Sequence, residues 1–311
     1  MGREMTEQGI LRASILVTVG VASLGILFGL LSGSYAITFD GMYALADAGM
    51  SGVALVVARL IAAHAAETPG TDRLRERFSM GVWHLEPMVL ALNGTLLIGV
   101  SVYALVNAVG SLLSGGRPLE FGWAVAYAAA VAAVCAAMAL VEARANRRIR
   151  SALVGLDVRA WTMSGGITVA LLVAFALGLA TEGTDWAWIG PYVDPAALAL
   201  VCLVIIPMPV SIVRRALADI LLVTPPALMA QIDAVAREVV ARHGLAAHKA
   251  YAARVGRARL IELYFIVPPG GPARPIEYWD AIRDEIGGMI GGAEADRWLT
   301  IVFTGDREWA E

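Results

Sequence analysis

Residues 34–51 read SYAITFDGMYALADAGMS and place two acids and the phenol of Tyr43 in a largely apolar run. Asp40, Tyr43 and Asp47 are spaced i, i+3 and i+7, so on a helix they share one face. A carboxylate inside a membrane is costly, and such residues usually face a bundle interior and mark an ion or proton path. A plainer interpretation is that each acid pairs with a basic or hydroxyl neighbour and holds helices together. Two acids and a phenol on one face favour the ion path.

The composition of the chain indicates a membrane protein. Of its 311 residues, 58% are hydrophobic and 16% are charged, which is far too apolar for a soluble globular protein. The net charge of −3 indicates no nucleic-acid partner. Cys135 and Cys202 lie inside apolar runs and form no CxxC pair, so they suggest neither a thiolate metal site nor a structural disulfide.

Six apolar segments are long enough to cross a hydrocarbon layer of about 30 Å. They are Ala13–Leu31, Tyr35–Ala63, Pro87–Leu113, Phe121–Val141, Ala160–Ala180 and Asp194–Val213. No convincing cleavage motif follows the first segment, so we expect a retained helix and not a signal peptide. Asn93 and Asn107 in the third segment are expected to hydrogen-bond between helices.

Arginines distinguish the two sides of the membrane. They lie between segments two and three, between four and five, and after six: Arg73, Arg75, Arg77, Arg144, Arg147, Arg148, Arg150, Arg159, Arg214 and Arg215. The opposite loops are short and hold one arginine, Arg117. Because basic loops stay on the cytoplasmic side, the pattern predicts six spans of the cell (inner) membrane with both termini in the cytoplasm.

The chain after Thr224 has the composition of a small soluble domain. Helices are expected at Ala227–His243 and Ile276–Ile290, and strands at His248–Val255, Arg259–Val267 and Trp298–Thr304. This order predicts an α+β domain in which two helices cover one face of a small mixed sheet. We expect a transmembrane domain at residues 1–222 and a cytoplasmic domain at residues 223–311.

Several motifs resemble those of the cation diffusion facilitator family. MYALADAGMS (42–51) resembles the family's acid-x-x-x-Asp signature, and FSMGVWHLEP (78–87) resembles its loop before helix three. Asp157 in LDVRAWTMSGG matches a common acid on helix five, and DPAAL at Asp194 resembles the start of helix six. Residues 248–265 are similar to the first hairpin of the family's soluble domain, with His248 and Gly256 in register.

The resemblance covers essentially the whole chain and implies a fold and a function. Members have six transmembrane helices, a cytoplasmic ferredoxin-like domain and a homodimeric assembly in the lipid bilayer. They exchange divalent metal ions for protons and move the metal as cargo, so no permanently bound cofactor is expected. The implied function is divalent metal cation efflux by metal/proton antiport.

The family's transport site departs from its usual pattern in this chain. It pairs two acids on helix two with a His or Asp and an Asp on helix five. Tyr43 and Asp47 stand at the first pair of positions, and Ala160 and Ser164 at the second. The resemblance is therefore to a divergent member with degenerate metal sites.

The other family sites are reduced as well. The metal cluster before helix three is missing, and His84 stands where a basic residue is usual. In the soluble domain His248 remains, while Tyr264 replaces a frequent histidine. A zinc site normally needs His or Cys ligands with tetrahedral closure, so this chain is not expected to build one there.

The candidate metal ligands form a ladder of oxygen groups. They are Asp47, Asp40, Tyr43, Ser164 and Asp157, with His84, Glu86 and His248 as secondary candidates. Asp40 and Asp47 lie about 10 Å apart along a helix axis and cannot chelate one ion. Oxygen ligands favour Mn²⁺ or Fe²⁺ over zinc. In plainer interpretations Asp157 is an interfacial acid at a helix start, Glu86 is a first-turn residue, and the histidines are no ligands.

Three functional classes remain open from the sequence. A proton-coupled divalent-metal exporter is favoured. A non-transporting metal sensor or pseudo-transporter, with the fold and the dimer retained, is raised by the missing ligands of helix five. A membrane enzyme is disfavoured, because the sequence shows no nucleophile–base pair and no phosphate-binding loop.

Overall fold

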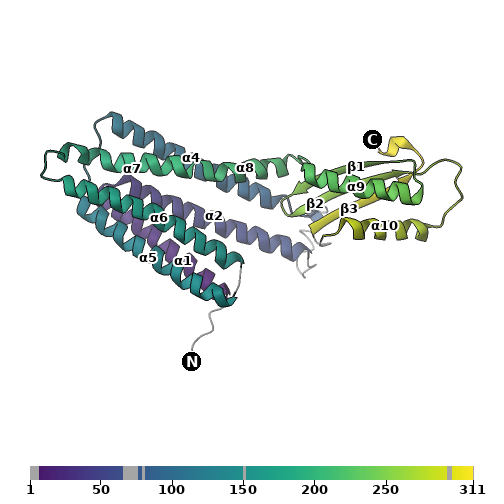
Figure 1. Ribbon diagram of the computed structural model, residues 1–311, viewed down its shortest axis with the longest axis horizontal. Helices are drawn as coiled ribbons and strands as arrows, with labels where there is room; N and C mark the ends of the chain where they lie inside the picture. The colour runs from purple at the N-terminus through teal and green to yellow at the C-terminus, as the bar shows by residue number, and fades with distance from the viewer. Residues whose placement is uncertain (1–6, 66–75, 79–80, 150–151, 293–295, 311) are drawn as a thin grey trace, which may run out of the picture. The chain divides into compact units, whose positions relative to one another are not determined.

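The structure of the chain is a computed structural model, which describes residues 7–65, 76–78, 81–149, 152–292 and 296–310 (Figure 1). Arg73, Arg75 and Arg150, and Ser79 and Met80 of the loop before the third segment, lie outside these residues. Within the described ranges, six helical segments are long and apolar enough to cross a membrane. They are Arg12–Ser32, Tyr35–His64, Leu85–Leu113, Phe121–Arg148, Asp157–Thr181 and Ala187–Ile220. The six expected segments are confirmed.

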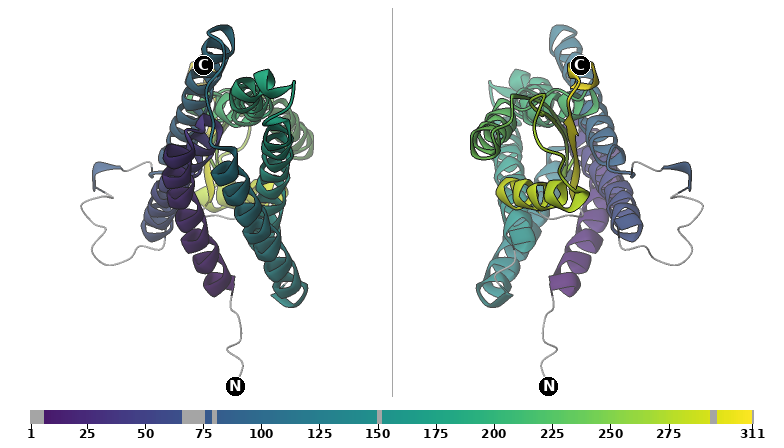
Figure 2. Two further views of the ribbon diagram at one scale, coloured as in Figure 1. Left: turned by 90° about the vertical axis from the view of Figure 1, so that its left-hand side faces the viewer. Right: turned by 90° about the vertical axis from the view of Figure 1, so that its right-hand side faces the viewer.

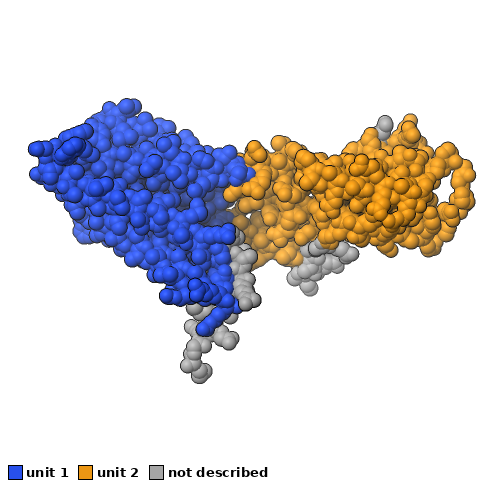
Figure 3. All heavy atoms as spheres, viewed as in Figure 1, with its two compact units in different colours: residues 1–52, 93–211 blue, residues 53–92, 212–311 orange. Residues whose placement is uncertain are grey.

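The chain divides into two compact units (Figure 3). Unit 1 comprises residues 1–52 and 93–211, and unit 2 comprises residues 53–92 and 212–311. Helices α2 (Tyr35–Ala65) and α4 (Leu85–Leu113) contribute residues to both units.

Unit 1 is a bundle of apolar helices. Besides parts of α2 and α4 it contains α1 (Glu7–Ser32), α5 (Phe121–Ile149), α6 (Ala152–Thr181), the short helix η1 (Ala187–Ile189) and α7 (Gly190–Ile205). Its core includes the fully buried side chains of Phe175, Leu198 and Ile37. The bundle therefore places the polar positions of α2, α5 and α6 within one packed unit.

Glycines let α1 and α2 approach each other closely. A β-carbon at Gly41 would lie 2.6 Å from the carbonyl oxygen of Ala22. A β-carbon at Gly25 would lie 2.5 Å from the hydroxyl of Tyr127 on α5. Small residues at helix interfaces allow such backbone contact in membrane proteins. These glycines thereby set the distance of α2 from its neighbours.

Asp194 on α7 holds the beginning of α2. Its carboxylate, 2% exposed, accepts a 2.5 Å hydrogen bond from the Ser34 hydroxyl and further bonds from the backbone N–H groups of Tyr35 and Ala36. The first N–H groups of a helix lack partners within the helix, and a negative charge there is favourable. The acid that begins the DPAAL motif therefore caps another helix.

The sixth segment is longer than the sequence predicted. A span was expected at Asp194–Val213, and the structure has a span at Ala187–Ile220 that includes two helices, α7 and α8 (Pro207–Ile220). Pro207 begins α8, and proline has no N–H to donate to the preceding turn. The sixth span is therefore confirmed, and it is divided at Pro207.

Unit 2 contains the α+β domain that the C-terminal sequence predicts. Its elements are α9 (Pro226–His243), β1 (Ala247–Val255), β2 (Ala258–Ile266), α10 (Ile276–Ile290), β3 (Arg297–Thr304) and the short helix η3 (Arg307–Ala310). The strand order is β1-β2-β3, with β1 and β2 antiparallel and β2 and β3 parallel. Gly256, at a φ of +60°, makes the turn between β1 and β2, which confirms the expected hairpin.

One face of this mixed sheet is covered by both helices, as the right-hand view of Figure 2 shows. Ile232 of α9 and Ile286 of α10 pack with Ile261, Leu263 and Phe265 of β2, and all five side chains are fully buried. The alternation along β2 puts these three apolar side chains on one face. The expected two-helix cover is confirmed, and the core lies entirely within residues 226–311.

Candidate functional site

The polar face of α2 is built as its sequence predicts. Asp40 and Tyr43 are partly buried, and Asp47, near the middle of the helix, is exposed. The Tyr43 ring packs against the ring of Phe39, with 5.7 Å between their centroids. Most of the surrounding residues of α2 are apolar, and the nearby Thr38 hydroxyl already donates to the backbone carbonyl oxygen of Ser34.

Asp47 has a partner on α4. The side-chain amide of Asn93 donates a 3.3 Å hydrogen bond to Asp47 Oδ1. The other end of this amide, the carbonyl oxygen Oδ1, is buried and accepts no hydrogen bond within the described part of the chain. Asn93 therefore bonds between helices as expected. It also presents an oxygen next to the acid that matches the family signature.

Asn107 does not follow the same expectation. Its side-chain amide donates to the carbonyl oxygen of Tyr103, four residues earlier in α4, at 2.8 Å. The bond stays within the helix because Asn107 is on an exposed side of α4. The prediction of an interhelical bond was wrong for this residue.

Asp40 lies with groups of α5 rather than with Asp47. Its carboxylate is close enough to the Tyr127 hydroxyl and the Cys135 thiol to act on both electrostatically. The Cys135 thiol donates a long sulfur hydrogen bond, 3.9 Å, to the hydroxyl of Ser164 on α6. The Tyr127 hydroxyl is buried and has no hydrogen-bond partner among the described residues. Three helices thus bring Asp40, Tyr127, Cys135 and Ser164 into one cluster.

Sequence reasoning missed Tyr127 and Cys135. We expected neither cysteine to take part in a metal site, because no second Cys or His is spaced for chelation. The structure places Cys135 against Ser164, one of the sequence-predicted residues. Residues 121–141 of α5 are apolar on all sides, so periodicity gave no sign of which face meets α2 and α6.

Asp157 lies apart from this cluster. It is partly buried in the second turn of α6, where its carboxyl group interacts with that of Glu142 on α5. Seven residues separate it from Ser164, which is about 10 Å along a helix. The expected ladder from Asp40 to Asp157 thus has Ser164 next to Cys135 and Asp157 next to Glu142. Glu142 was missed because the fourth span was expected to end at Val141.

The secondary candidates have partners inside unit 2. The side chain of Glu86, in the first turn of α4, accepts a 2.9 Å ion-pair hydrogen bond from Arg257 Nε, and this bond raises the pKa of the guanidinium. His248 Nε2 lies 3.4 Å from Asp233 Oδ1. The His84 ring packs against Phe78, with centroids 5.8 Å apart.

Within the described ranges, no three or more His, Cys, Asp or Glu side chains are grouped closely enough to hold a metal ion. A site in this chain therefore draws on hydroxyl, phenol and amide oxygens in addition to one or two acids. Asp47 with Asn93, and Asp40 with Ser164 and Cys135, are arrangements of unit 1 that meet this description. Water would complete the coordination of a hard divalent ion.

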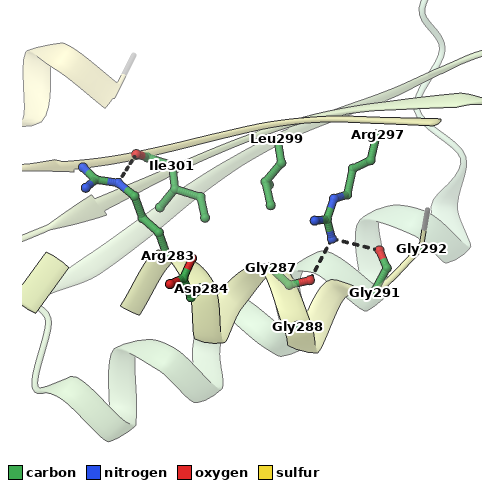
Figure 4. Close-up of a pocket in the computed structure, with 9 residues that line it drawn as sticks. All are labelled: Arg283, Asp284, Gly287, Gly288, Gly291, Gly292, Arg297, Leu299 and Ile301. Carbon is green, nitrogen blue, oxygen red and sulfur yellow. Dashed lines mark hydrogen bonds between the residues drawn. The ribbon is translucent and has the colours of Figure 1, made fainter. Parts of the chain in front are cut away.

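Unit 2 has a hollow of about 580 Å³ between α10 and β3 (Figure 4). Arg297 Nη1 donates to the carbonyl oxygens of Gly287, at 2.7 Å, and Gly291, at 3.0 Å. Arg283 Nε donates to the carbonyl oxygen of Ile301 at 3.3 Å. Cations near the end of a helix stabilise its last carbonyl groups. These arginines hold the end of α10 against β3.

Comparison with known protein families identifies the family of the transmembrane domain. The family model for the cation efflux transmembrane domain matches residues 11–221. The chain belongs to the cation efflux family. Members of this family, the cation diffusion facilitators, are multi-pass membrane transporters of metal cations and not enzymes. A comparison with curated proteins found no match.

Proposed function

We propose that this cation efflux protein exports a divalent metal ion in exchange for protons through the polar face of α2. The observation that carries the proposal is the exposed carboxylate of Asp47 near the middle of a membrane span, next to a buried and unpaired amide oxygen. An exposed acid at this depth is too costly in lipid, so it faces a water-filled passage.

The metal site that we propose centres on Asp47. The Asn93 oxygen and the Tyr43 phenol are the neighbouring ligands. The ion next reaches the cluster of Asp40 and Ser164, in which Asp40 lies nearer than Asp47 to the start of α2. Two separate positions are needed, because Asp40 and Asp47 lie about 10 Å apart along the helix. Asp157, the fifth sequence-predicted residue, lies beside Glu142 and belongs to neither of these two positions.

Oxygen ligands support a hard or borderline ion, with Mn²⁺ or Fe²⁺ first and zinc a poorer substrate. The Cys135 thiol is the one soft group next to the Asp40 cluster in the described chain. As a neutral thiol it is a weak ligand, since metals bind the thiolate. Zinc would gain affinity only where this thiol loses its proton.

Proton exchange follows from the same carboxylates. A metal ligand must be deprotonated, so each proton taken up by Asp47 or Asp40 weakens the hold on the cation. Alternate occupation by metal and proton is the physical basis of the proposed antiport.

The assembly that we propose is a homodimer in the cell (inner) membrane, with both termini in the cytoplasm. Residues 1–222 form the transport domain and residues 223–311 the cytoplasmic domain. On the sheet face away from α9 and α10, Tyr251 and Trp298 are 42% and 37% exposed. Exposed aromatic side chains of this kind are typical of interfaces and support pairing of the cytoplasmic domains.

A non-transporting metal sensor or pseudo-transporter is the second candidate. It is favoured by Ala160 and Ser164 at the helix-five positions and by the lack of a three-ligand group in the described residues. Such a protein would keep the fold and bind metal without moving it.

Metal uptake into inverted membrane vesicles tests the proposal. Mn²⁺, Fe²⁺ and Zn²⁺ are each supplied with and without an imposed pH gradient. We expect uptake of Mn²⁺ and Fe²⁺ that rises with the gradient and exceeds that of vesicles lacking the protein. Metal binding without uptake of any ion would favour the sensor.

A further inference from the structure

Glu142 is a buried acid that the proposed transport path does not use. It lies near the end of α5, its side chain is 0% exposed, and neither carboxylate oxygen has a hydrogen-bond partner among the described residues. Burying an unpaired carboxylate costs several kcal/mol or more by general estimates. A group in this position is neutralised either by a proton or by a bound positive charge.

The polar neighbours of Glu142 among the described residues supply no positive charge. They are the carboxyl group of Asp157, the Ser14 hydroxyl and the indole N–H of Trp161. Trp161 Nε1 already donates a 2.8 Å hydrogen bond to Ser14 Oγ, which ties α6 to α1 beside the acid. A second carboxyl group adds repulsion, because like charges at close range oppose ionisation.

Arginines on the same helix ends do not neutralise the pair within the described structure. Five of them are exposed: Arg12, Arg144, Arg147, Arg148 and Arg159. No ion pair between an arginine and Glu142 or Asp157 is found in the described ranges, and no cation is among the groups that act on Glu142. The exposed arginines keep their charges toward solvent or lipid headgroups.

We propose that Glu142 and Asp157, with the Ser14 hydroxyl, form a further binding site for a hard divalent cation, separate from the transport path, where α1, α5 and α6 meet. A divalent ion cancels both carboxylate charges, whereas a single shared proton leaves one of them. All the ligand atoms are oxygens, which suits Mn²⁺ or Mg²⁺. The inference rests on the proposed function in one respect: the ion that occupies this site is taken to be the transported ion.

The test is Mn²⁺ binding to the full-length protein in detergent, measured as loss of the free Mn²⁺ signal in electron paramagnetic resonance. We expect Glu142→Gln to bind one Mn²⁺ fewer per chain than the unmodified protein. Asp47→Asn should lose a different Mn²⁺ and keep the one at Glu142. Glu182→Gln, the same change at an exposed acid of unit 1, should bind as the unmodified protein does.

Asp157→Asn gives an independent reading, because Asp157 is only partly buried and its loss perturbs packing less. It should lose the same Mn²⁺ as Glu142→Gln, with size-exclusion chromatography as the check on folding. Unchanged Mn²⁺ binding by folded Glu142→Gln or Asp157→Asn protein would overturn the proposal and leave the pair with a shared proton. If vesicle uptake is absent while both variants lose one Mn²⁺, the site stands and the transport proposal fails.

Discussion

The Cys135 thiol donates a 3.9 Å hydrogen bond to the hydroxyl of Ser164, a residue that stands at a metal-ligand position of the family. The thiol also lies within electrostatic reach of Asp40. A soft sulfur group therefore borders the proposed site, whose other candidate ligands are oxygens. Its contribution to metal preference can be measured directly.

Cys135→Ser replaces the sulfur by a hydroxyl of similar shape and should shift metal preference further toward Mn²⁺. Because thiolate is the ligand that zinc prefers, residual zinc transport should fall several-fold while Mn²⁺ transport changes little. Competition between Mn²⁺ and Zn²⁺ in inverted vesicles measures the shift. Cys202→Ser is the matched control, since Cys202 is equally buried on α7. Zinc that outcompetes Mn²⁺ and Fe²⁺ in the unmodified protein would contradict the oxygen-site argument.

Asp47→Asn should abolish metal transport while the protein stays folded. The asparagine amide has the shape of the carboxylate and can still accept the hydrogen bond from Asn93. It lacks the negative charge that binds the cation. Asp40→Asn should have a smaller effect, because Asp40 belongs to the second position of the path. Initial uptake rates in vesicles are the measurement, with Glu182→Gln as the control. Wild-type flux in Asp47→Asn would refute the site.

Asp194→Ala should destabilise unit 1 without touching the proposed ligands. The change removes the acceptor of the Ser34 hydroxyl and of two N–H groups at the start of α2. Loss of a helix N-cap typically costs about 0.5–2 kcal/mol. We expect a lower thermal unfolding temperature in detergent, with Asp185→Ala, an exposed acid, as the control. Equal unfolding temperatures would show that the cap is dispensable.

The fragment Pro226–Glu311 should fold by itself. Its core is formed entirely by α9, α10 and the three strands, including Ile232, Phe265 and Ile286. Circular dichroism should show mixed helix and strand, and the fragment should pair in solution if the proposed dimer is correct. Zinc binding should be weak, because His248 is the one ligand of the family's soluble-domain site that the sequence analysis found retained. An unfolded fragment, or a tight zinc complex, would contradict this prediction.

The ion pairs of Glu285 should make this fragment less stable in acid. Glu285 on α10 accepts a 3.0 Å bond from His243 of α9 and pairs with Arg242, and these contacts lower its pKa below the ordinary 4.5. A lowered pKa stabilises the fold above pH 4.5, and this stabilisation is lost as the pH falls through the folded-state value. In Glu285→Gln, the free energy of unfolding measured in urea should be about 0.2–1 kcal/mol lower at pH 7 than in the unmodified fragment. Below pH 5 this free energy should fall less steeply in the variant. If the free energy of unfolding depends on pH in the same way in both proteins, the stabilising role of the Glu285 ion pairs is contradicted.

The sequence by itself determined the elements of this protein. Hydrophobic length is a local property, so six spans could be placed within a few residues of their helices. The helical period placed Asp40, Tyr43 and Asp47 on one face, and Gly256 between two alternating runs located the hairpin. The break at Pro207 was missed because the apolar run continues through it.

Only the tertiary structure decided which polar groups meet. The Cys135–Ser164 and Ser34–Asp194 contacts join residues 29 and 160 positions apart. The rotation of each apolar helix about its axis is set by close packing at residues such as Gly25 and Gly41, and not by a polar stripe. For this reason the sequence named Asp157 as a site residue but gave no sign of its neighbour Glu142.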